Sequence, residues 1–183
     1  KRTSKSIMVS SYSSPSVAVT ASKTKLHKGR NESVTINWGV QNAEKITLLQ
    51  DGVLVDKKCG HDDSYKCSIK DTTTFTVQAL ALDGKTTFSD SVTVEVHPDA
   101  KFKFESDKEY AFPTIPCTLS WTTKHAKRVE LNGKKVADNG TEIIKKGVEK
   151  DTTYTLVVTD EFGTKESSIT IKMLPVPRIN ALM

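Results

Sequence analysis

The sequence predicts an all-β protein built from two similar sandwich domains in tandem. Trp38 and Trp121 lie 83 residues apart, and a repeat of this length indicates whole domains. Short segments alternate apolar and polar residues, which is the period of half-buried strands, and helical periodicity is absent. Asp-Gly and Asn-Gly pairs between apolar runs indicate tight hairpins.

The repeat divides the chain of 183 residues into four parts. Pro15 opens the first copy, Pro98 opens the second, and the pattern starts again at Pro175, so we expect a longer parent protein. The expected parts are a linker or disordered start (1–14), a first sandwich (15–97), a second sandwich (98–175) and the start of a third repeat or a C-terminal tail (176–183).

The strand that holds the tryptophan is the clearest element of each copy. Its alternation predicts a core strand with the indole facing inward. Cys117 aligns with Val34 on this face and is expected to act as a small core residue. The apolar positions are Val34, Ile36, Trp38 and Val40 in the first copy, and Cys117, Leu119 and Trp121 in the second.

A hairpin follows the tryptophan strand in each copy. The next apolar strand ends at Asp51-Gly52 in the first copy and at Asn132-Gly133 in the second. A type I′ turn needs positive φ at both central residues, which these pairs tolerate. We therefore expect the chain to return through Val53 and Val55, or through Val136.

The last two strands of each copy close the sandwich. The first of these two strands is expected at 71–77 in the first copy and at 151–156 in the second, where Asp-Thr-Thr precedes an aromatic residue. The turn to the last strand follows at Gly84 in the first copy and at Gly163 in the second. About seven strands per copy result, with turn signals every 8 to 12 residues or so, which is typical of a two-sheet sandwich.

These strands, hairpins and threonine-rich corners resemble the immunoglobulin-like and fibronectin type III-like repeats of bacterial surface and multidomain proteins, over residues 15–175. The resemblance implies two seven-stranded sandwiches arranged head to tail, with Trp38, Trp121, Phe75 and Tyr154 as core signature residues. It places Tyr154 at the family's tyrosine corner, where the phenol hydrogen-bonds back to the backbone. Phe75 cannot make that bond, and the antibody-type disulfide between the sheets is missing.

Composition and charge exclude some classes of function. The net charge of +5 comes from 27 basic and 22 acidic residues that are interspersed in both halves, so it favours solubility over dedicated nucleic-acid binding. Neither a basic helix nor an RNA-type aromatic signature is present. No apolar run approaches the ~18 residues of a membrane span, so we expect no membrane insertion.

Cys59 and Cys67 flank a segment where the chain is expected to turn between two strands. If those strands pair, the sulfurs could join in a disulfide, which would suit a compartment outside the reducing cytoplasm. The alternative is two thiols on a hairpin in a reduced cytoplasm. Cys59, His61 and Cys67 form only a partial set of metal ligands, because structural zinc requires four, so we expect no metal.

A basic run at Lys124, Lys127 and Arg128 is the main charged candidate site. It could bind an acidic polymer, face Asp51 and Asp71 of the other domain, or be a solvated loop. The sequons at Asn31 and Asn139 lie in expected loops, and chance accounts for them equally well.

We expect no catalytic function and no cofactor. The four histidines are scattered, and the chain has no nucleophile elbow, paired-histidine metal motif or glycine-rich phosphate loop. A lean sandwich core also offers no deep pocket in which pKa values could be tuned.

The leading interpretation is a non-catalytic structural, spacer and protein-interaction array within a larger, bacterial surface or secreted protein. Its partners would be neighbouring domains of the parent chain and a protein or polysaccharide ligand. One alternative is an intracellular, cytoplasmic scaffold that binds partners through exposed strand edges. The other is a carbohydrate-binding module, for which the aromatic residues without a core assignment are Tyr65, Phe88, Tyr110, Phe112 and Phe162.

Overall fold

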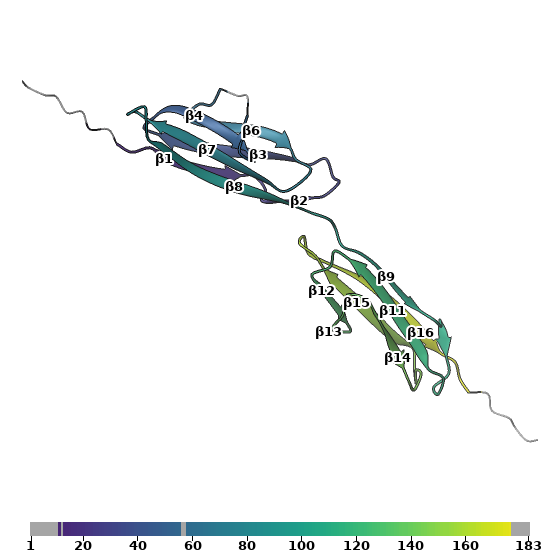
Figure 1. Cartoon of the computed structure of the whole chain (residues 1–183). Helices are drawn as coiled ribbons and strands as arrows, with labels where there is room; N and C mark the ends of the chain where they lie inside the picture. Colours follow the sequence, from purple (N-terminus) through teal and green to yellow (C-terminus); the bar gives the residue numbers. More distant parts are fainter. Residues whose placement is uncertain (1–10, 12, 56–57, 177–183) are drawn as a thin grey trace, which may run out of the picture. The chain divides into compact units, whose positions relative to one another are not determined.

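The computed structural model of this chain describes residues 11, 13–55 and 58–176. All regular elements in this part are β-strands (Figure 1). Within it, no helix offers the length and apolar character needed to cross a membrane.

The chain divides into two compact units between His97 and Pro98. The linker expected at 1–14 and the third repeat expected at 176–183 lie almost wholly outside the described residues, so both stay predictions.

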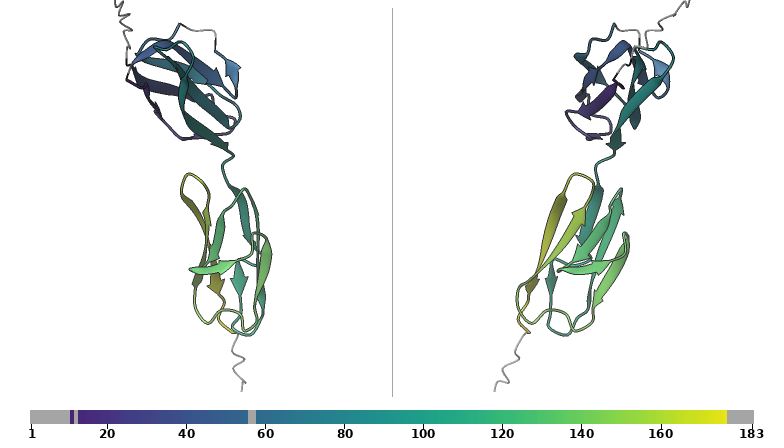
Figure 2. Two further views of the ribbon diagram at one scale, coloured as in Figure 1. Left: turned by 60° about the vertical axis from the view of Figure 1, so that its left-hand side comes forward. Right: turned by 90° about the vertical axis from the view of Figure 1, so that its left-hand side faces the viewer.

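The first domain is a sandwich of a three-stranded and a five-stranded sheet, which face each other in Figures 1 and 2. The strand orders are β1-β3-β6 and β2-β8-β7-β4-β5. Neighbouring strands are antiparallel, except that β2 runs parallel to β8. The strands are β1 (Ser16–Ala21), β2 (Lys25–His27), β3 (Ser33–Gln41), β4 (Ala43–Gln50), β5 (Val53–Leu54), β6 (Asp62–Ser68), β7 (Thr73–Ala81) and β8 (Thr87–His97).

The second domain repeats this topology. Its sheets have the orders β14-β11-β9 and β10-β16-β15-β12-β13, and β10 runs parallel to β16. Two immunoglobulin-like β-sandwiches in tandem, the predicted fold class, are thereby confirmed. The strands are β9 (Lys101–Ser106), β10 (Tyr110–Ala111), β11 (Cys117–Lys124), β12 (Arg128–Leu131), β13 (Lys134–Val136), β14 (Gly140–Ile144), β15 (Thr152–Thr159) and β16 (Thr164–Met173).

The first strand of each domain is broken in two, so the seven expected strands are present as eight segments. One half pairs with the tryptophan strand and the other with the last strand of the opposite sheet. A side-chain oxygen caps each break: Ser22 Oγ accepts the Thr35 N–H at 2.9 Å, and Asp107 Oδ1 accepts the Thr118 N–H at 2.7 Å. The broken strand can therefore change sheets without leaving this backbone group unpaired.

Each domain has its own hydrophobic core between its sheets. Trp38 and Trp121 are buried in these cores. The Trp38 indole N–H donates to the Gly60 carbonyl at 3.0 Å, and that of Trp121 donates to the Ala137 carbonyl at 2.9 Å. The indole thus fills the core and also fixes the loop that leads into β6 or β14.

Phe75 and Tyr154 hold matching inward positions on β7 and β15. Both are buried in their cores. Burial raises the pKa of Tyr154, and Cys117 and Glu142 add to the shift. Within the described part of the chain the Tyr154 hydroxyl makes no hydrogen bond, so the tyrosine-corner bond implied by the resemblance is not formed.

The period of the repeat changes along the chain. On the neighbouring strands, Val19 lies opposite Trp38 and Phe104 lies opposite Trp121. Val19 and Phe104 are 85 residues apart, whereas the tryptophans are 83 apart. The connection from the first strand to the tryptophan strand is therefore two residues shorter in the second domain.

The expected match of Pro15 with Pro98 is wrong for this reason. Pro15 precedes β1 directly, and the residue that precedes β9 directly is Ala100. A shift of two residues leaves every side chain on its face of the sheet, so alternation in the sequence could not reveal it.

Both predicted hairpins have type I′ geometry. The φ angles are 48° at Asp51 and 81° at Gly52, and 48° at Asn132 and 76° at Gly133. The first hairpin is longer by two pairs, because Leu49 and Gln50 extend β4 beyond the core position that Leu48 shares with Leu131 of the second domain.

Candidate functional site

No disulfide joins Cys59 to Cys67. The expected turn between them is an extended strand, β6, which pairs with β3 along its whole length. Cys67 lies opposite Val34 at one end of this ladder, and the Val40 N–H bonds to the His61 carbonyl at the other. At ~3.3 Å per residue, even Asp62 lies about 16 Å from Cys67 along the strand, well beyond the Cα separation of a disulfide. Of the two alternatives that the sequence left open, the structure therefore has the one without a disulfide.

Burial raises the pKa of the Cys67 thiol and of the Cys117 thiol. Both side chains are therefore protonated at neutral pH and are poor nucleophiles or metal ligands. Cys117 is fully buried in the second core. Within the described residues, no group of three or more His, Cys, Asp or Glu side chains is arranged to hold a metal ion.

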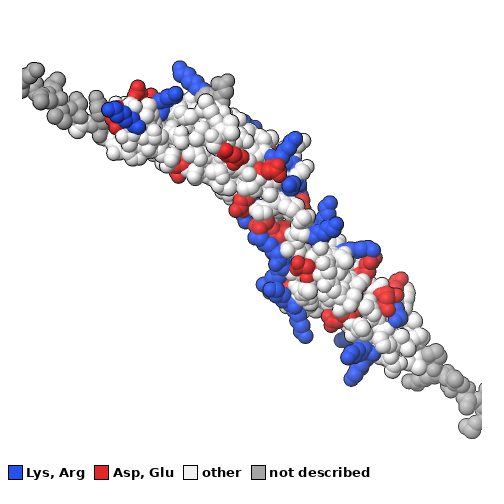
Figure 3. Space-filling view, in the orientation of Figure 1, with Lys and Arg blue, Asp and Glu red and all other residues white. Residues whose placement is uncertain are grey.

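The basic run of the second domain is largely neutralised by its own neighbours. Lys127 forms an ion pair with Glu161, and Arg128 pairs with Glu130 at 2.6 Å. Figure 3 shows Lys and Arg side chains interleaved with Asp and Glu over the face that it draws. Lys124 lies at the end of β11, opposite Lys101. Ion pairing within the domain weakens the argument for a polyanion site here.

The aromatic side chains without an expected core role do not form a platform. Tyr65 lies 6.4 Å from Phe75, ring centroid to centroid, and packs on the first core. Tyr110 is exposed, with the Lys172 ammonium 5.6 Å from its ring centroid. The other three are half-buried on separate elements: Phe88 on β8, Phe112 between β10 and β11, and Phe162 between β15 and β16.

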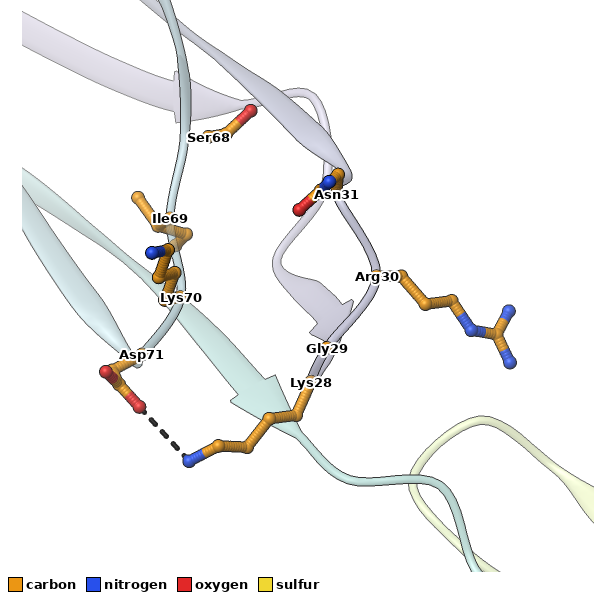
Figure 4. Close-up of a pocket in the computed structure, with 8 residues that line it drawn as sticks. All are labelled: Lys28, Gly29, Arg30, Asn31, Ser68, Ile69, Lys70 and Asp71. Carbon is orange, nitrogen blue, oxygen red and sulfur yellow. Dashed lines mark hydrogen bonds and ion pairs between the residues drawn. The ribbon is translucent and has the colours of Figure 1, made fainter.

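A surface hollow in the first domain is the best-formed candidate site. It lies between the loop from β2 to β3 and the loop from β6 to β7 (Figure 4). Ile69, a buried residue of the core, forms part of its wall. The lining residues are Lys28, Gly29, Arg30, Asn31, Ser68, Ile69, Lys70 and Asp71.

Positive charge predominates around this basic hollow. Three of its lining residues are cations and one is a carboxylate. Lys28 Nζ reaches across to Asp71 Oδ1 at 3.2 Å. Asn31, on the loop from β2 to β3, and Ser68, at the end of β6, face one another (Figure 4). The Arg30 side chain extends outward at the rim. The arrangement can offer cations, an amide and a hydroxyl to a ligand next to an apolar wall.

The second domain closes the same place. Gly147, in the loop from β14 to β15, has a φ of 63°. A Cβ there would meet the Phe112 carbonyl oxygen and would lie 2.6 Å from that of Ile115. The two loops therefore touch. Only glycine fits between them, and the hollow is specific to the first domain.

A buried polar cluster holds the beginning of the second domain. The side chain of Asp160 is 2% exposed. It accepts the Ala100 N–H at 2.9 Å and the Phe162 N–H at 2.8 Å, and Lys165 Nζ lies 3.3 Å away. Burial alone would raise the pKa of Asp160, but these hydrogen bonds and the ammonium lower it to about 2. The carboxylate is therefore a structural anchor.

The first domain replaces this cluster with apolar residues. The ladder β7–β8 places Ala81 and Phe88 where β15–β16 places Asp160 and Lys165. Pro15, which has no N–H to donate, stands where Ala100 stands. Pro15, Ala81 and Phe88 instead line a shallow hollow together with Asp83 and Thr86.

Comparisons with known proteins support the fold. No family model matches the chain. An uncharacterized protein from Ruminiclostridium cellulolyticum is 30% identical over 176 residues, which cover 93% of this chain and 46% of that protein. The chain therefore spans about half the length of the curated relative that it matches.

Two solved structures of tandem immunoglobulin domains are similar in fold. Sidekick-1 immunoglobulin domains 1–5 match with a TM-score of 0.62 and 9% identity, over 90% of this chain and 40% of that chain. The titin I-band fragment I67–I69 matches with a TM-score of 0.55 and 12% identity, over 87% of this chain and 65% of that chain. Identities this low show a shared fold only.

Sequence reasoning missed the basic hollow. Its cations are spread over two loops that lie about 40 residues apart in the chain, so no run of charge marks them. A comparison of the loops of the two copies could have pointed to it, because the charge differs next to matching core residues. Lys70 follows Ile69 in the first copy, whereas Glu149 follows Val148 in the second.

Proposed function

We propose that this chain is a non-catalytic structural and protein-interaction segment of a larger, bacterial surface or secreted protein. The observation that carries the proposal is that each domain has a complete core of its own, joined by a connection of only three residues, Pro98 to Ala100. Ala100 is buried and bonded to Asp160. Such a chain suits a series of domains that sets spacing and offers sheet surfaces to partners.

The comparisons add support without identifying a partner. The curated relative from Ruminiclostridium cellulolyticum is about twice as long as this chain, as expected for one segment of a larger protein. A carbohydrate-binding role has less support, because the aromatic side chains without an expected core role are scattered and mostly half-buried. A cytoplasmic scaffold that uses strand edges draws support from the strands at the edges of the sheets, such as β6 and β14, each of which has a neighbouring strand on one side.

Force spectroscopy on the whole chain, held by its two ends, tests the structural role. We expect two separate unfolding events, each releasing roughly 25–30 nm for a domain of about 80 residues at ~3.6 Å per residue. A single event for the whole chain would overturn the proposal of independent mechanical units.

Protease shaving of intact cells that express the parent protein tests the location. A surface protein should release peptides of this chain before the cells lyse, with a cytoplasmic enzyme as the control that stays intact. Protection of these peptides until lysis would favour the cytoplasmic alternative.

A further inference from the structure

We infer that the basic hollow of the first domain binds an acidic peptide segment of a partner protein. The inference rests on the proposed role in protein interaction and gives that role a site and a ligand class. The ligand is an extended segment in which an apolar side chain is flanked by Asp or Glu. Four features of the hollow support this assignment.

The first feature is the combination of an apolar wall with polar loops. Ile69 belongs to the core cluster of the domain and also lines the hollow. An apolar ligand side chain placed against it would extend the core outward and leave water. Asn31 and Ser68, which face one another across the hollow in Figure 4, can exchange hydrogen bonds with peptide groups.

The second feature is the charge of the rim. Lys28, Arg30 and Lys70 give three positive charges against the one negative charge of Asp71. Glu32, the next carboxylate along the loop, is already held by Lys23 at 2.7 Å, and this hydrogen bond lowers its pKa. An acidic ligand would therefore meet a favourable potential, which raises association rates and selects against basic segments.

The third feature is that the cations are accessible. The side chains of Lys28 and Asp71 are 57% and 80% exposed. An ion pair this exposed contributes little to stability, so a ligand carboxylate can compete with Asp71 for Lys28. Lys70 has no ion pair with any residue that the structure describes, and its ammonium can meet a second ligand carboxylate.

The fourth feature favours a peptide over an acidic sugar. None of the eight lining residues is aromatic, so the hollow lacks the flat ring on which sugars usually stack. A peptide supplies what the walls require, namely an apolar side chain, backbone polar groups and carboxylates.

The second domain provides an internal control for this site. Gly147 closes the corresponding space against Phe112 and Ile115. The charges of the rim are also reversed there, since Glu149 and Lys150 follow Val148 where Lys70 and Asp71 follow Ile69. An acidic peptide should therefore bind one domain and leave the other unaffected.

NMR titration of the whole labelled chain with the capped peptide Asp-Leu-Asp-Leu-Asp tests the inference. We expect saturable shifts confined to residues 28–31 and 68–71, and weaker binding as salt rises. Lys70→Glu, which copies the second domain, should weaken binding at least about tenfold. The matched control Lys134→Glu makes the same charge change on the hairpin of the second domain and should change affinity less than about twofold.

Other outcomes would overturn the inference. Equal binding of the capped Asn-Leu-Asn-Leu-Asn peptide would show that the hollow does not recognise the carboxylates of the ligand. Shifts spread over both domains would indicate general attraction to anions, and tighter binding of an oligoglucuronate would identify an acidic glycan instead. Absence of saturable shifts at millimolar peptide would also refute the site. The structural role would not be refuted by that result, because it is tested separately by the two unfolding events expected under force.

Discussion

The Ala100 N–H donates a 2.9 Å hydrogen bond to Asp160 Oδ2, and this bond ties the start of the second domain to the turn between its last two strands. Lys165 Nζ bonds to the same carboxylate at 3.3 Å and to the Ala100 carbonyl at 3.2 Å. Both polar groups of the Ala100 backbone are thereby satisfied inside the domain. The first domain has Pro15, Ala81 and Phe88 at the corresponding positions, and Pro15 has no N–H that needs an acceptor.

Replacing Asp160 by Ala should destabilise the second domain by about 2 to 3 kcal/mol. The substitution leaves the buried Ala100 N–H without an acceptor and removes the carboxylate that pairs with Lys165. Denaturant unfolding followed by amide resonances of each domain measures the effect, and the first domain should unfold as in the wild type. An unchanged second domain would show that the cluster carries no stability.

The triple variant Ala100→Pro, Asp160→Ala and Lys165→Phe provides the matched control. It transplants the apolar solution of the first domain, so donor and acceptor are removed together. Removing both partners costs far less than orphaning one, and we expect at least half of the lost stability to return. A triple variant less stable than Asp160→Ala alone would contradict the correspondence of the two sites.

Acid should weaken the second domain through Asp160. The pKa of this group is about 2 in the folded domain and near 3.9 in an unfolded chain. A lowered folded pKa contributes stability above about pH 4, and this contribution is lost as the pH falls toward 2. Urea unfolding between pH 5 and pH 2 should therefore lose about 2 kcal/mol that the Asp160→Asn variant does not lose. Parallel pH curves for the two proteins would refute the assignment.

Gly140→Ala should destabilise the second domain by about 1 to 3 kcal/mol. A Cβ at Gly140 would lie 2.7 Å from Cζ2 of Trp121, and the indole is held by its bond to the Ala137 carbonyl. Gly39→Ala is the control, because its nearest neighbour is Asp62 Oδ1 at 3.2 Å, the end of a flexible side chain. We expect the control to lose less than about 1 kcal/mol of stability in thermal unfolding. Equal losses for the two variants would mean that the Trp121 indole can move aside.

Asp51→Asn should leave the first hairpin intact, whereas Asp51→Ala should cost about 1 to 2 kcal/mol. Asp51 Oδ1 accepts the Thr74 N–H at 2.8 Å, and Asn132 Oδ1 accepts the Thr155 N–H at the same distance. The amide oxygen of Asn can take the same bond, and Asn tolerates positive φ better than Ala. Hydrogen exchange of the Thr74 amide reports the bond directly, and it should accelerate only in the Ala variant.

Much of each fold could be predicted because it depends on local patterns. Alternation of Val34, Ile36 and Trp38 indicates a half-buried strand wherever it lies in the fold, and β3 has that strand's burial pattern. The type I′ turns at Asp51-Gly52 and Asn132-Gly133 follow from the φ preferences of those residues alone.

The predictions that failed concern how separate segments of the chain lie against one another. The segment from Cys59 to Cys67 contains polar residues that suit a turn, and its extended form as β6 depends on pairing with β3. The first-strand alignment failed because a shift of two residues preserves the alternating pattern. The basic hollow escaped notice because Lys28 and Lys70 meet only when two loops converge.

By itself, the sequence determined the fold class, the type I′ hairpins and the inward face of the tryptophan strands, because each depends on residue preferences over a few neighbouring positions. Tertiary structure alone decided whether the space between the loops is open, as at Ile69, or closed, as at Gly147. It also decided that Asp160 would be a buried anchor. These features depend on contacts between distant segments, whose geometry is set by packing and hydrogen bonding across the whole domain.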